Sequence, residues 1–182
     1  MGIVAQVIGT VGIALLLAST LVRRRVLLLG LDAVGSLVMG IHWALLGATA
    51  AVGISIIVVA MDLAGTDPRR AWGRLVIIGA LPVACLVVAL VWSGPADLLA
   101  LIGMAAIAGS RLSRGQIRLR ALATASAVPW GLYGVIMGSI PQMIFSTVYF
   151  IAMGISVVRI ARGTWHPRPA AGEATILPPD GP

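Results

Sequence analysis

The most informative segment of the chain is residues 128–142, which read Val-Pro-Trp-Gly-Leu-Tyr-Gly-Val-Ile-Met-Gly-Ser-Ile-Pro-Gln. An earlier segment, His-Trp-Ala-Leu-Leu-Gly at 42–47, has the same Trp-x-x-x-Gly spacing as Trp130 and Gly134. In both places one apolar run of helix length precedes the tryptophan and another follows it. The pattern predicts an internal repeat, which matters in membrane transporters because their substrate sites lie where two repeats face each other.

The composition is typical of an integral membrane protein. Of the 182 residues, 59% are hydrophobic and 10% are charged, and the mean hydropathy is +1.05. The 13 basic residues are all arginine, and the formal net charge is +7. These arginines form clusters between apolar runs and no basic stripe with stacking aromatics, so we expect no nucleic-acid partner.

No pattern in the sequence indicates catalysis or metal binding. There is no Ser-His-Asp set, His-Glu-x-x-His motif, phosphate-binding loop or pair of carboxylates at a credible depth. The single cysteine, Cys85, excludes a disulfide framework and a cysteine-based metal site. We therefore expect a protein without enzymatic activity, bound metal or cofactor.

Seven apolar runs follow one another, each close to the roughly 20 residues that a helix needs to cross the hydrocarbon core of a bilayer. Helices are required because every backbone N–H and C=O group in lipid must be paired internally. We predict an all-α integral membrane protein of seven transmembrane helices, at about residues 3–22, 26–47, 50–65, 75–92, 96–110, 118–138 and 141–160.

Arginines mark every second gap between the predicted spans. Clusters follow the first, third, fifth and seventh spans, whereas the gaps after the second, fourth and sixth spans contain no arginine. Because arginine-rich short loops resist translocation, this alternation predicts an N-terminus outside and a C-terminus in the cytoplasm. The residues assigned this topogenic role are Arg23, Arg24, Arg25, Arg69, Arg70, Arg74, Arg111, Arg114, Arg159 and Arg162.

The repeat predicts how the spans are grouped. Placing Trp43 on Trp130 also places Gly47 on Gly134, and it aligns the second span with the sixth and the third with the seventh. The fourth span is then a connector that gives both copies the same orientation. We predict two parallel three-helix bundles, residues 1–66 and 95–162, joined by a cytoplasmic loop and connector helix at 67–94. Residues 163–182, rich in Pro, Gly and Ala, are predicted to be a disordered cytoplasmic tail.

Several short elements carry a resemblance to a known family. They are Ala5-Gln6 with Gly9, the arginine cluster at 23–25, Gly40-Ile41-His42 followed by Leu45-Leu46-Gly47, and Gly138-Ser139-Ile140 with Gly154, Arg159 and Arg162. On these residues the chain resembles the YgjV-type bacterial inner-membrane protein family, over nearly its whole membrane part. The resemblance implies a multi-pass protein of the bacterial cytoplasmic membrane.

A more distant similarity is to the sugar-transporting SWEET and PQ-loop proteins. Trp130-Gly131-Leu132-Tyr133-Gly134 and Ile140-Pro141-Gln142 resemble the Trp-x-x-Tyr-Gly and Ile-Pro-Asn elements of their second bundle. This similarity implies a three-one-three arrangement of seven helices with the N-terminus outside. It concerns architecture, which does not carry function with it.

His42 is the one ionisable side chain well inside a predicted span. Ionisable groups within a membrane are costly, and they are first candidates for proton relays or ligand contacts. The alternative is a neutral imidazole that donates to a backbone carbonyl and needs no solute. Asp32 and Asp62 lie near cytoplasmic ends within reach of arginines, which favours paired structural charges over proton carriers.

Two tryptophans are candidates for contact with a ligand. Trp43 and Trp130 are related by the predicted repeat, and each either stacks on a ligand in a central cavity or belongs to the aromatic belt at the membrane surface. Pro129 and Pro141 bracket the join between the sixth and seventh spans, where a proline provides a hinge or simply starts a helix.

Polar side chains follow one face of the last span. Gln142, Ser146 and Tyr149 are spaced four and then three residues apart, so they share a helix face. This face forms one wall of a polar cavity or, as the more frequent alternative, makes hydrogen bonds between helices. Four glycines, Gly35, Gly40, Gly47 and Gly53, are predicted to allow close helix contact.

Two functions of different classes fit these observations. The preferred hypothesis is passage of a small-molecule solute between the two bundles. The alternative is a non-transporting scaffold or accessory subunit that packs against a membrane partner or a second copy of itself. The lipid bilayer is the expected surrounding in both. The residues predicted to bind the solute are His42, Trp43, Trp130, Tyr133, Gln142, Ser146 and Tyr149.

Overall fold

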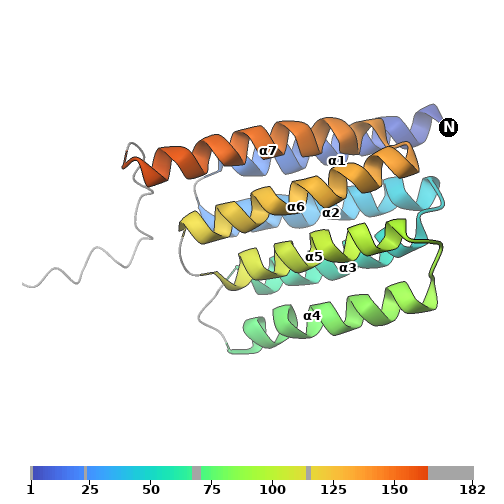
Figure 1. Cartoon of the computed structure of the whole chain (residues 1–182), viewed down its shortest axis with the longest axis horizontal. Helices are drawn as coiled ribbons and strands as arrows, with labels where there is room; N and C mark the ends of the chain where they lie inside the picture. The colour runs from blue at the N-terminus through green and yellow to red at the C-terminus, as the bar shows by residue number, and fades with distance from the viewer. Residues whose placement is uncertain (1, 23, 67–70, 114–115, 164–182) are drawn as a thin grey trace, which may run out of the picture.

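The computed structural model describes residues 2–22, 24–66, 71–113 and 116–163, which form seven helices (Figure 1). All lie within a few residues of the predicted spans, and the largest difference is at α4, which begins at Ala71 instead of about residue 75. The all-helical prediction is confirmed. The helices are α1 (Ile3–Leu21), α2 (Arg25–Leu45), α3 (Thr49–Ala64), α4 (Ala71–Leu90), α5 (Ala96–Leu112), α6 (Gln116–Met137) and α7 (Ile140–Ala161).

The helices are arranged in two rows that face each other. α1, α2 and α3 form one row, and α7, α6 and α5 form the other (Figure 1). The rows contact each other through α1 with α7 and through α3 with α5, whereas no Cα atoms of α2 and α6 approach within 8 Å. The two middle helices, α2 and α6, are therefore held apart. Side chains fill part of the space between them, and the cavity described below is the remainder.

The fourth helix lies at one side of the bundle. α4 contacts α3 and α5 and no other helix in the described part of the chain. The contact with α3 is close at Gly53, where an added Cβ would lie 2.5 Å from Val87 Cγ1. Gly35 and Gly40 likewise face neighbouring helices, against Leu16 and Ser55, as predicted.

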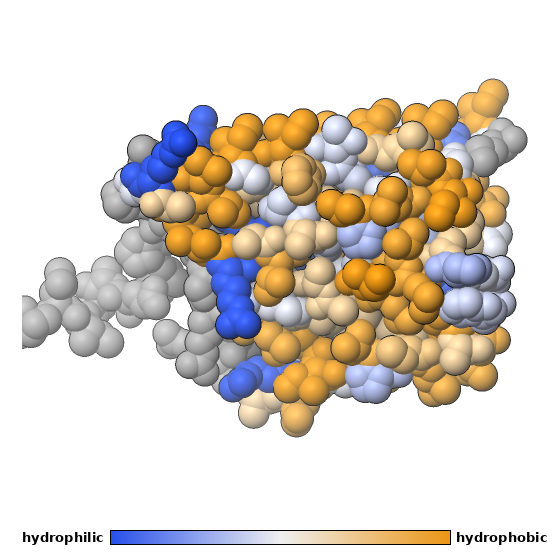
Figure 2. All heavy atoms as spheres, in the orientation of Figure 1, coloured by the Kyte–Doolittle hydropathy of each residue, from blue (hydrophilic) through white to orange (hydrophobic). Residues whose placement is uncertain are grey.

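The outer surface of the bundle is apolar. Large hydrophobic side chains are exposed on every helix, including Ile3 (81% exposed), Leu21 (83%), Leu75 (69%) and Leu90 (76%). Figure 2 shows hydrophobic residues over most of this face, with strongly hydrophilic ones near the end where α7 finishes. Soluble monomers rarely expose large contiguous apolar patches, whereas lipid requires them.

Four helices of the described chain are long and apolar enough to cross a membrane: α1, α2 from Val26 onward, α4 and α7. α3 is apolar but shorter, with 16 residues. The remaining helices, α5 and α6, lie alongside them in the same bundle (Figure 1). The structure therefore supports an all-helical membrane protein that crosses the bilayer several times.

The described arginines at helix ends lie at one end of the bundle. Arg24 precedes α2, Arg74 is near the start of α4, and Arg159 and Arg162 close α7. Because successive helices run in opposite directions, these positions share one end (Figure 1). Other predicted residues lie outside the described chain: Arg23, Arg69, Arg70, Arg114 and the tail from residue 164 to 182.

Two turns of the chain have the same local geometry. Gly47 (φ 74°) and Gly138 (φ 64°) both have the left-handed conformation that closes many helices. Ala48 N–H donates to the carbonyl of Trp43 at 2.9 Å, and Ser139 N–H donates to that of Gly134 at 2.8 Å. The prediction that Gly47 allows close helix contact is wrong, because nothing lies within 4 Å of the place of its Cβ. Glycine is needed there for its backbone conformation.

The two turn glycines, Gly47 and Gly138, are 91 residues apart (138 − 47). Some contacts between helices recur along the chain with the same 91-residue separation. The Trp-x-x-x-Gly spacing pairs Trp43 with Trp130, which are 87 residues apart (130 − 43), so it differs from the separation of these recurring contacts by about one helical turn. The contacts that recur are Gly12 on Met39 with Gly103 on Trp130, and Gly40 on Ser55 with Gly131 on Ser146.

Candidate functional site

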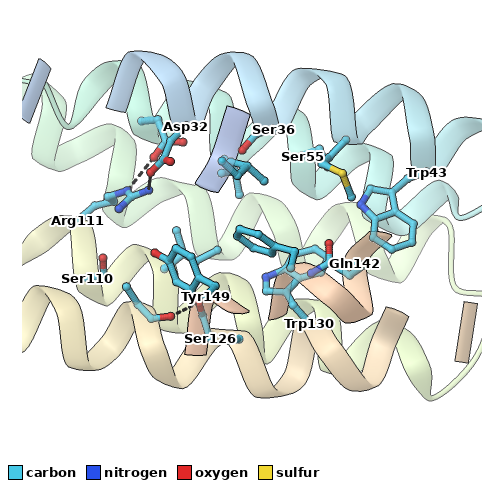
Figure 3. A pocket seen from close by; sticks show the side chains of 18 residues that line it. Asp32, Ser36, Trp43, Ser55, Ser110, Arg111, Ser126, Trp130, Gln142 and Tyr149 are labelled. Atoms are coloured by element: carbon cyan, nitrogen blue, oxygen red, sulfur yellow. Dashed lines mark hydrogen bonds and ion pairs between the residues drawn. The ribbon is translucent and has the colours of Figure 1, made fainter. Parts of the chain in front are cut away.

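A cavity of about 90 Å³ lies between the two rows of helices (Figure 3). All helices except α4 contribute to its lining within the described chain. Leu16 comes from α1, Trp43 from α2, Val58 from α3, Ile107 from α5 and Phe145 from α7, while α6 provides residues such as Ala127. A volume of this size holds a few water molecules.

Aromatic rings occupy one end of the cavity. Trp43, which is 1% exposed, stacks on Trp130 with ring centroids 6.4 Å apart and an interplanar angle of 26°. Tyr133 meets both rings edge-on, at 5.4 Å from Trp43 and 5.9 Å from Trp130. Trp130 Nε1 and the Tyr133 hydroxyl are buried and have no hydrogen-bond partner among the described residues. Trp43 is buried and Trp130 is half-buried, and both rings line the cavity. Their stacking on a ligand stays a prediction.

The face of α7 that carries Gln142 forms one wall. Gln142 and Tyr149 line the cavity (Figure 3), and Gln142 Nε2 donates to Ser146 Oγ at 3.1 Å. This hydrogen bond joins two residues of one helix, whereas the sequence favoured bonds between helices. Ser146 itself packs against Gly131 of α6 and is not among the lining residues.

Charged side chains occupy the other end of the cavity. Arg111 on α5 donates from Nη2 to Asp32 Oδ2 at 2.8 Å and from Nε to Asp62 Oδ1 at 2.7 Å. Ser19 on α1 donates to Asp32 Oδ1. Arg111 is 7% exposed and Asp62 is 0% exposed, so both side chains are buried. The expected pairing of the two aspartates with arginine is confirmed, and their partner is buried at the end of α5.

Arg111 therefore differs from its predicted topogenic role. The predicted fifth span stopped at residue 110, which placed Arg111 in a loop, but α5 continues to Leu112 and carries this side chain into the bundle. Buried charges are costly unless they are paired. The two aspartates near the same end were the signal that a buried arginine was required, and sequence alone did not single out which one.

Two further polar atoms in the lining have no partner in the part of the chain that the structure describes. Asp62 Oδ2 and Ser110 Oγ are buried and make no hydrogen bond there. Both residues are 0% exposed. Burying such an atom without a hydrogen-bond partner costs free energy, so native proteins rarely contain one. Most of the exceptions bind an ion, a water molecule or a ligand.

His42 is fully buried but does not line the cavity. Its Nδ1 lies 2.7 Å from the carbonyl of Ala5, so Nδ1 carries the hydrogen and donates. Nε2 lies 2.7 Å from Ser139 Oγ and accepts from it. Ser139 Oγ in turn accepts from Gln142 N–H at 3.2 Å. The imidazole joins α1 and α2 to the turn before α7, which is the arrangement expected for the structural alternative.

The structure brings four of the seven predicted solute-binding residues to the cavity. Tyr133, Ser146 and His42 are buried beside it. Pro129 lies within α6 and Pro141 in the first turn of α7. The binding and hinge roles of these residues stay predictions. The four that line the cavity are Trp43, Trp130, Gln142 and Tyr149.

The described residues include no group of three or more His, Cys, Asp or Glu side chains that could hold a metal ion. The cavity therefore offers hydrogen-bonding atoms, aromatic faces and one carboxyl–guanidinium cluster as its chemistry.

Comparisons with known proteins give one result. No curated protein and no solved structure matches the chain. The model of one protein family, described as a bacterial inner membrane protein, matches residues 3–164. The apolar outer surface and the apolar helices agree with that description. The match covers almost the whole described structure, and the chain belongs to the Imp-YgjV family of bacterial inner membrane proteins.

Proposed function

We propose that this inner-membrane protein moves small polar solutes through the cavity between its two rows of helices. The observation that carries the proposal is that the cavity lining holds buried polar atoms that have no partner within the described chain. Asp62 Oδ2, Ser110 Oγ and Trp130 Nε1 are such atoms, and they come from three different helices. A scaffold gains nothing from leaving them unpaired, whereas a solute or its water shell pairs with them.

The two rows act as two copies of one three-helix unit with α4 as the connector. The matching turns at Gly47 and Gly138, and the glycine contacts in the same register, support this reading. Related units that face each other across a central site are common in transporters, where one unit moves against the other around the bound solute. In this proposal all seven helices span the bilayer.

The end that carries the arginines faces the cytoplasm. Arg24, Arg74, Arg159 and Arg162 lie there, and arginine-rich segments are retained inside. The N-terminus is then outside. The cluster of Asp32, Asp62 and Arg111 lies toward the cytoplasmic end, and the stacked Trp43 and Trp130 lie toward the outer end of the path.

The cavity is small. About 90 Å³ accommodates a few waters, so a larger solute enters only when the rows separate at one end. Close backbone approaches between the rows are confined to α1 with α7 and α3 with α5. Such a movement would alter these contacts and the side-chain contacts of Trp43 with Trp130 and of Asp32 with Arg111. Alternating access by this route exposes the cavity to one side at a time.

The test is uptake by the full-length protein in liposomes, with a panel of sugars, amino acids and other small metabolites. The blocking variant is Ala127→Leu, since Ala127 lines the cavity and is 3% exposed. The matched control is Ala125→Leu, which adds the same side chain to the exposed side of α6. We expect uptake of at least one solute by the wild type and the control, and at least a tenfold loss in Ala127→Leu, equivalent to about 1.4 kcal/mol.

Two outcomes would contradict the proposal. One is that the wild type takes up no member of the panel, and the other is that Ala127→Leu transports as well as Ala125→Leu. Either result, with both variants folded, favours the scaffold alternative.

A further inference from the structure

We propose that Asp62 binds a proton in the cavity, at Oδ2, and exchanges it with water on the arginine-rich side. This proposal rests on a difference in hydrogen bonding between the two aspartates that share Arg111. Each accepts one hydrogen bond from the guanidinium, at 2.7 Å for Asp62 and 2.8 Å for Asp32. Their second oxygens have different surroundings.

Asp32 has the environment of an ionised carboxylate. Its Oδ2 accepts from Arg111 and its Oδ1 accepts from the Ser19 hydroxyl. Both oxygens therefore have donors, and the side chain retains slight exposure, at 7%. Hydrogen bonds donated to both oxygens stabilise the charged form of a carboxyl group.

Asp62 has the environment of a neutral acid. Its Oδ1 accepts from Arg111 Nε, but its Oδ2 has no donor among the described residues, and the residue is 0% exposed. An ionised carboxylate is acceptor-only, so a bare buried oxygen is a costly arrangement for it. A proton on Oδ2 removes the charge and turns that oxygen into a donor, which can serve a water or a solute in the adjoining cavity.

The other groups around Asp62 do not supply the missing donor. Tyr149 on α7 lines the same cavity, and Arg120 on α6 donates to Met153 Sδ at 3.6 Å. On α4 the titratable side chains of the described chain are Arg74 and Cys85, which are both exposed. Arg111 is thus the cationic partner that the two carboxyl groups share by hydrogen bonds.

A metal cation fits this place less well than a proton. Calcium takes six to eight oxygen ligands, and magnesium needs near-octahedral coordination. The unpaired oxygens in the described lining are Asp62 Oδ2 and Ser110 Oγ, which come from α3 and α5. Two oxygens are too few to replace a hydration shell, but one is enough for a proton.

If the proposed transport is correct, on which this step rests, the proton on Asp62 is the coupling ion. When the rows separate at the arginine-rich end, water reaches the cavity and the cost of the charged form falls, so Asp62 releases the proton to that side. When they close again, Asp62 must be reprotonated or be paired with a positive group of the solute.

The direct test is infrared spectroscopy of the full-length protein in lipid, because a protonated carboxyl group has a C=O stretching band that an ionised one lacks. We expect such a band in the wild type, a shift of it on isotopic labelling of aspartate, and its loss in Asp62→Asn. Asp97→Asn is the comparison variant, because Asp97 is also 0% exposed and its Oδ1 also has no partner among the described residues, although its Oδ2 accepts from Ser93 N–H and Oγ–H at 2.8 and 2.9 Å. The band that Asp62→Asn removes should remain in Asp97→Asn. A wild type without the band, or a band lost in Asp97→Asn instead, would overturn the proposal.

Melting temperatures give an independent test. Asn has the shape of a neutral Asp, so Asp62→Asn should lower the melting temperature by less than about 4 °C. Asp32→Asn removes the ionised partner of Arg111 and should lower it by about 10 °C. Equal losses in the two variants would mean that both aspartates are charged, which contradicts the proposal.

Proton coupling can be tested separately from transport. For any solute found in the liposome panel, we expect a pH gradient to drive accumulation by the wild type and to have no effect on Asp62→Asn. If the wild type takes up solute to the same extent with and without the pH gradient, proton coupling is wrong but transport is not contradicted. Absence of all uptake overturns transport, and the infrared band still decides the protonation of Asp62.

Discussion

The indole of Trp130 occupies the space that Gly103 leaves empty: a Cβ on Gly103 would lie 2.6 Å from both Cδ1 and Nε1 of the ring. The ring cannot move away, because Trp43 stacks on it and Tyr133 packs at its edge. Gly103 is therefore required for α5 and α6 to approach as closely as they do.

Gly103→Ala should destabilise the protein by about 1–3 kcal/mol through overpacking. The measurement is thermal unfolding in detergent. The control is Gly154→Ala on α7, where nothing lies within 4 Å of the new Cβ and the change should stay within about 1 kcal/mol. Recovery of stability in Gly103→Ala combined with Trp130→Leu would confirm that the ring is the obstacle, and no recovery would contradict it.

Arg111→Met should cost about 3–5 kcal/mol, because it leaves the buried Asp32 charge without its partner. Adding Asp32→Asn to the same chain should restore most of the loss. Arg74→Met is the control, since Arg74 is exposed on α4 and should change stability by no more than about 0.5 kcal/mol. Equal melting temperatures for Arg111→Met and Arg74→Met would show that the cluster is not buried as described.

Ser139→Ala removes an oxygen that both donates to His42 Nε2 and accepts from Gln142 N–H. We expect a loss of about 1–3 kcal/mol from the missing cap and the unpaired imidazole nitrogen. Ser156→Ala is the matched control, because that hydroxyl donates only to the carbonyl of Ala152 in its own helix, at 3.0 Å. Chemical unfolding of the two variants side by side measures the difference, and a similar small cost for both would argue against the bridge.

The left-handed glycines provide a paired prediction. Gly47→Ala and Gly138→Ala should each lose about 1–2 kcal/mol, because an L-residue is strained at positive φ. Gly79→Ala on α4 serves as the control, since its Cβ meets open space within a helix. Unfolding in detergent would contradict the prediction if either turn variant were as stable as the control.

Sequence reasoning located the helices well because the hydrocarbon core imposes a length on each apolar run. It did less well where two rows of side chains meet. The spacing of Trp43 and Trp130 suggested one register, but the recurring glycine contacts follow another. Both tryptophans fill the core from different turns of their helices, so a shared spacing to the next glycine did not report equivalent positions.

The charged end of the cavity shows a second limit. Asp32 and Asp62 were predicted to pair with arginine, and they do, but hydropathy ended the fifth span one residue before Arg111. A hydropathy profile cannot distinguish an arginine in a solvent-exposed loop from one whose side chain is buried against two carboxyl groups on other helices. Similarly, His42 was singled out because it is an ionisable side chain inside a predicted span, and its hydrogen bonds to Ala5 and Ser139 depend on two distant segments.

The position of α4 has a consequence for how the gene could be divided. Among the described helices α4 contacts only α3 and α5, so α1, α2, α6 and α7 pack together without touching it. A chain cut in the segment between α3 and α4 should therefore yield two fragments that reassociate when co-expressed, in the manner of a heterodimer of half-sized subunits. The single polypeptide then serves mainly to supply the two parts in equal amounts.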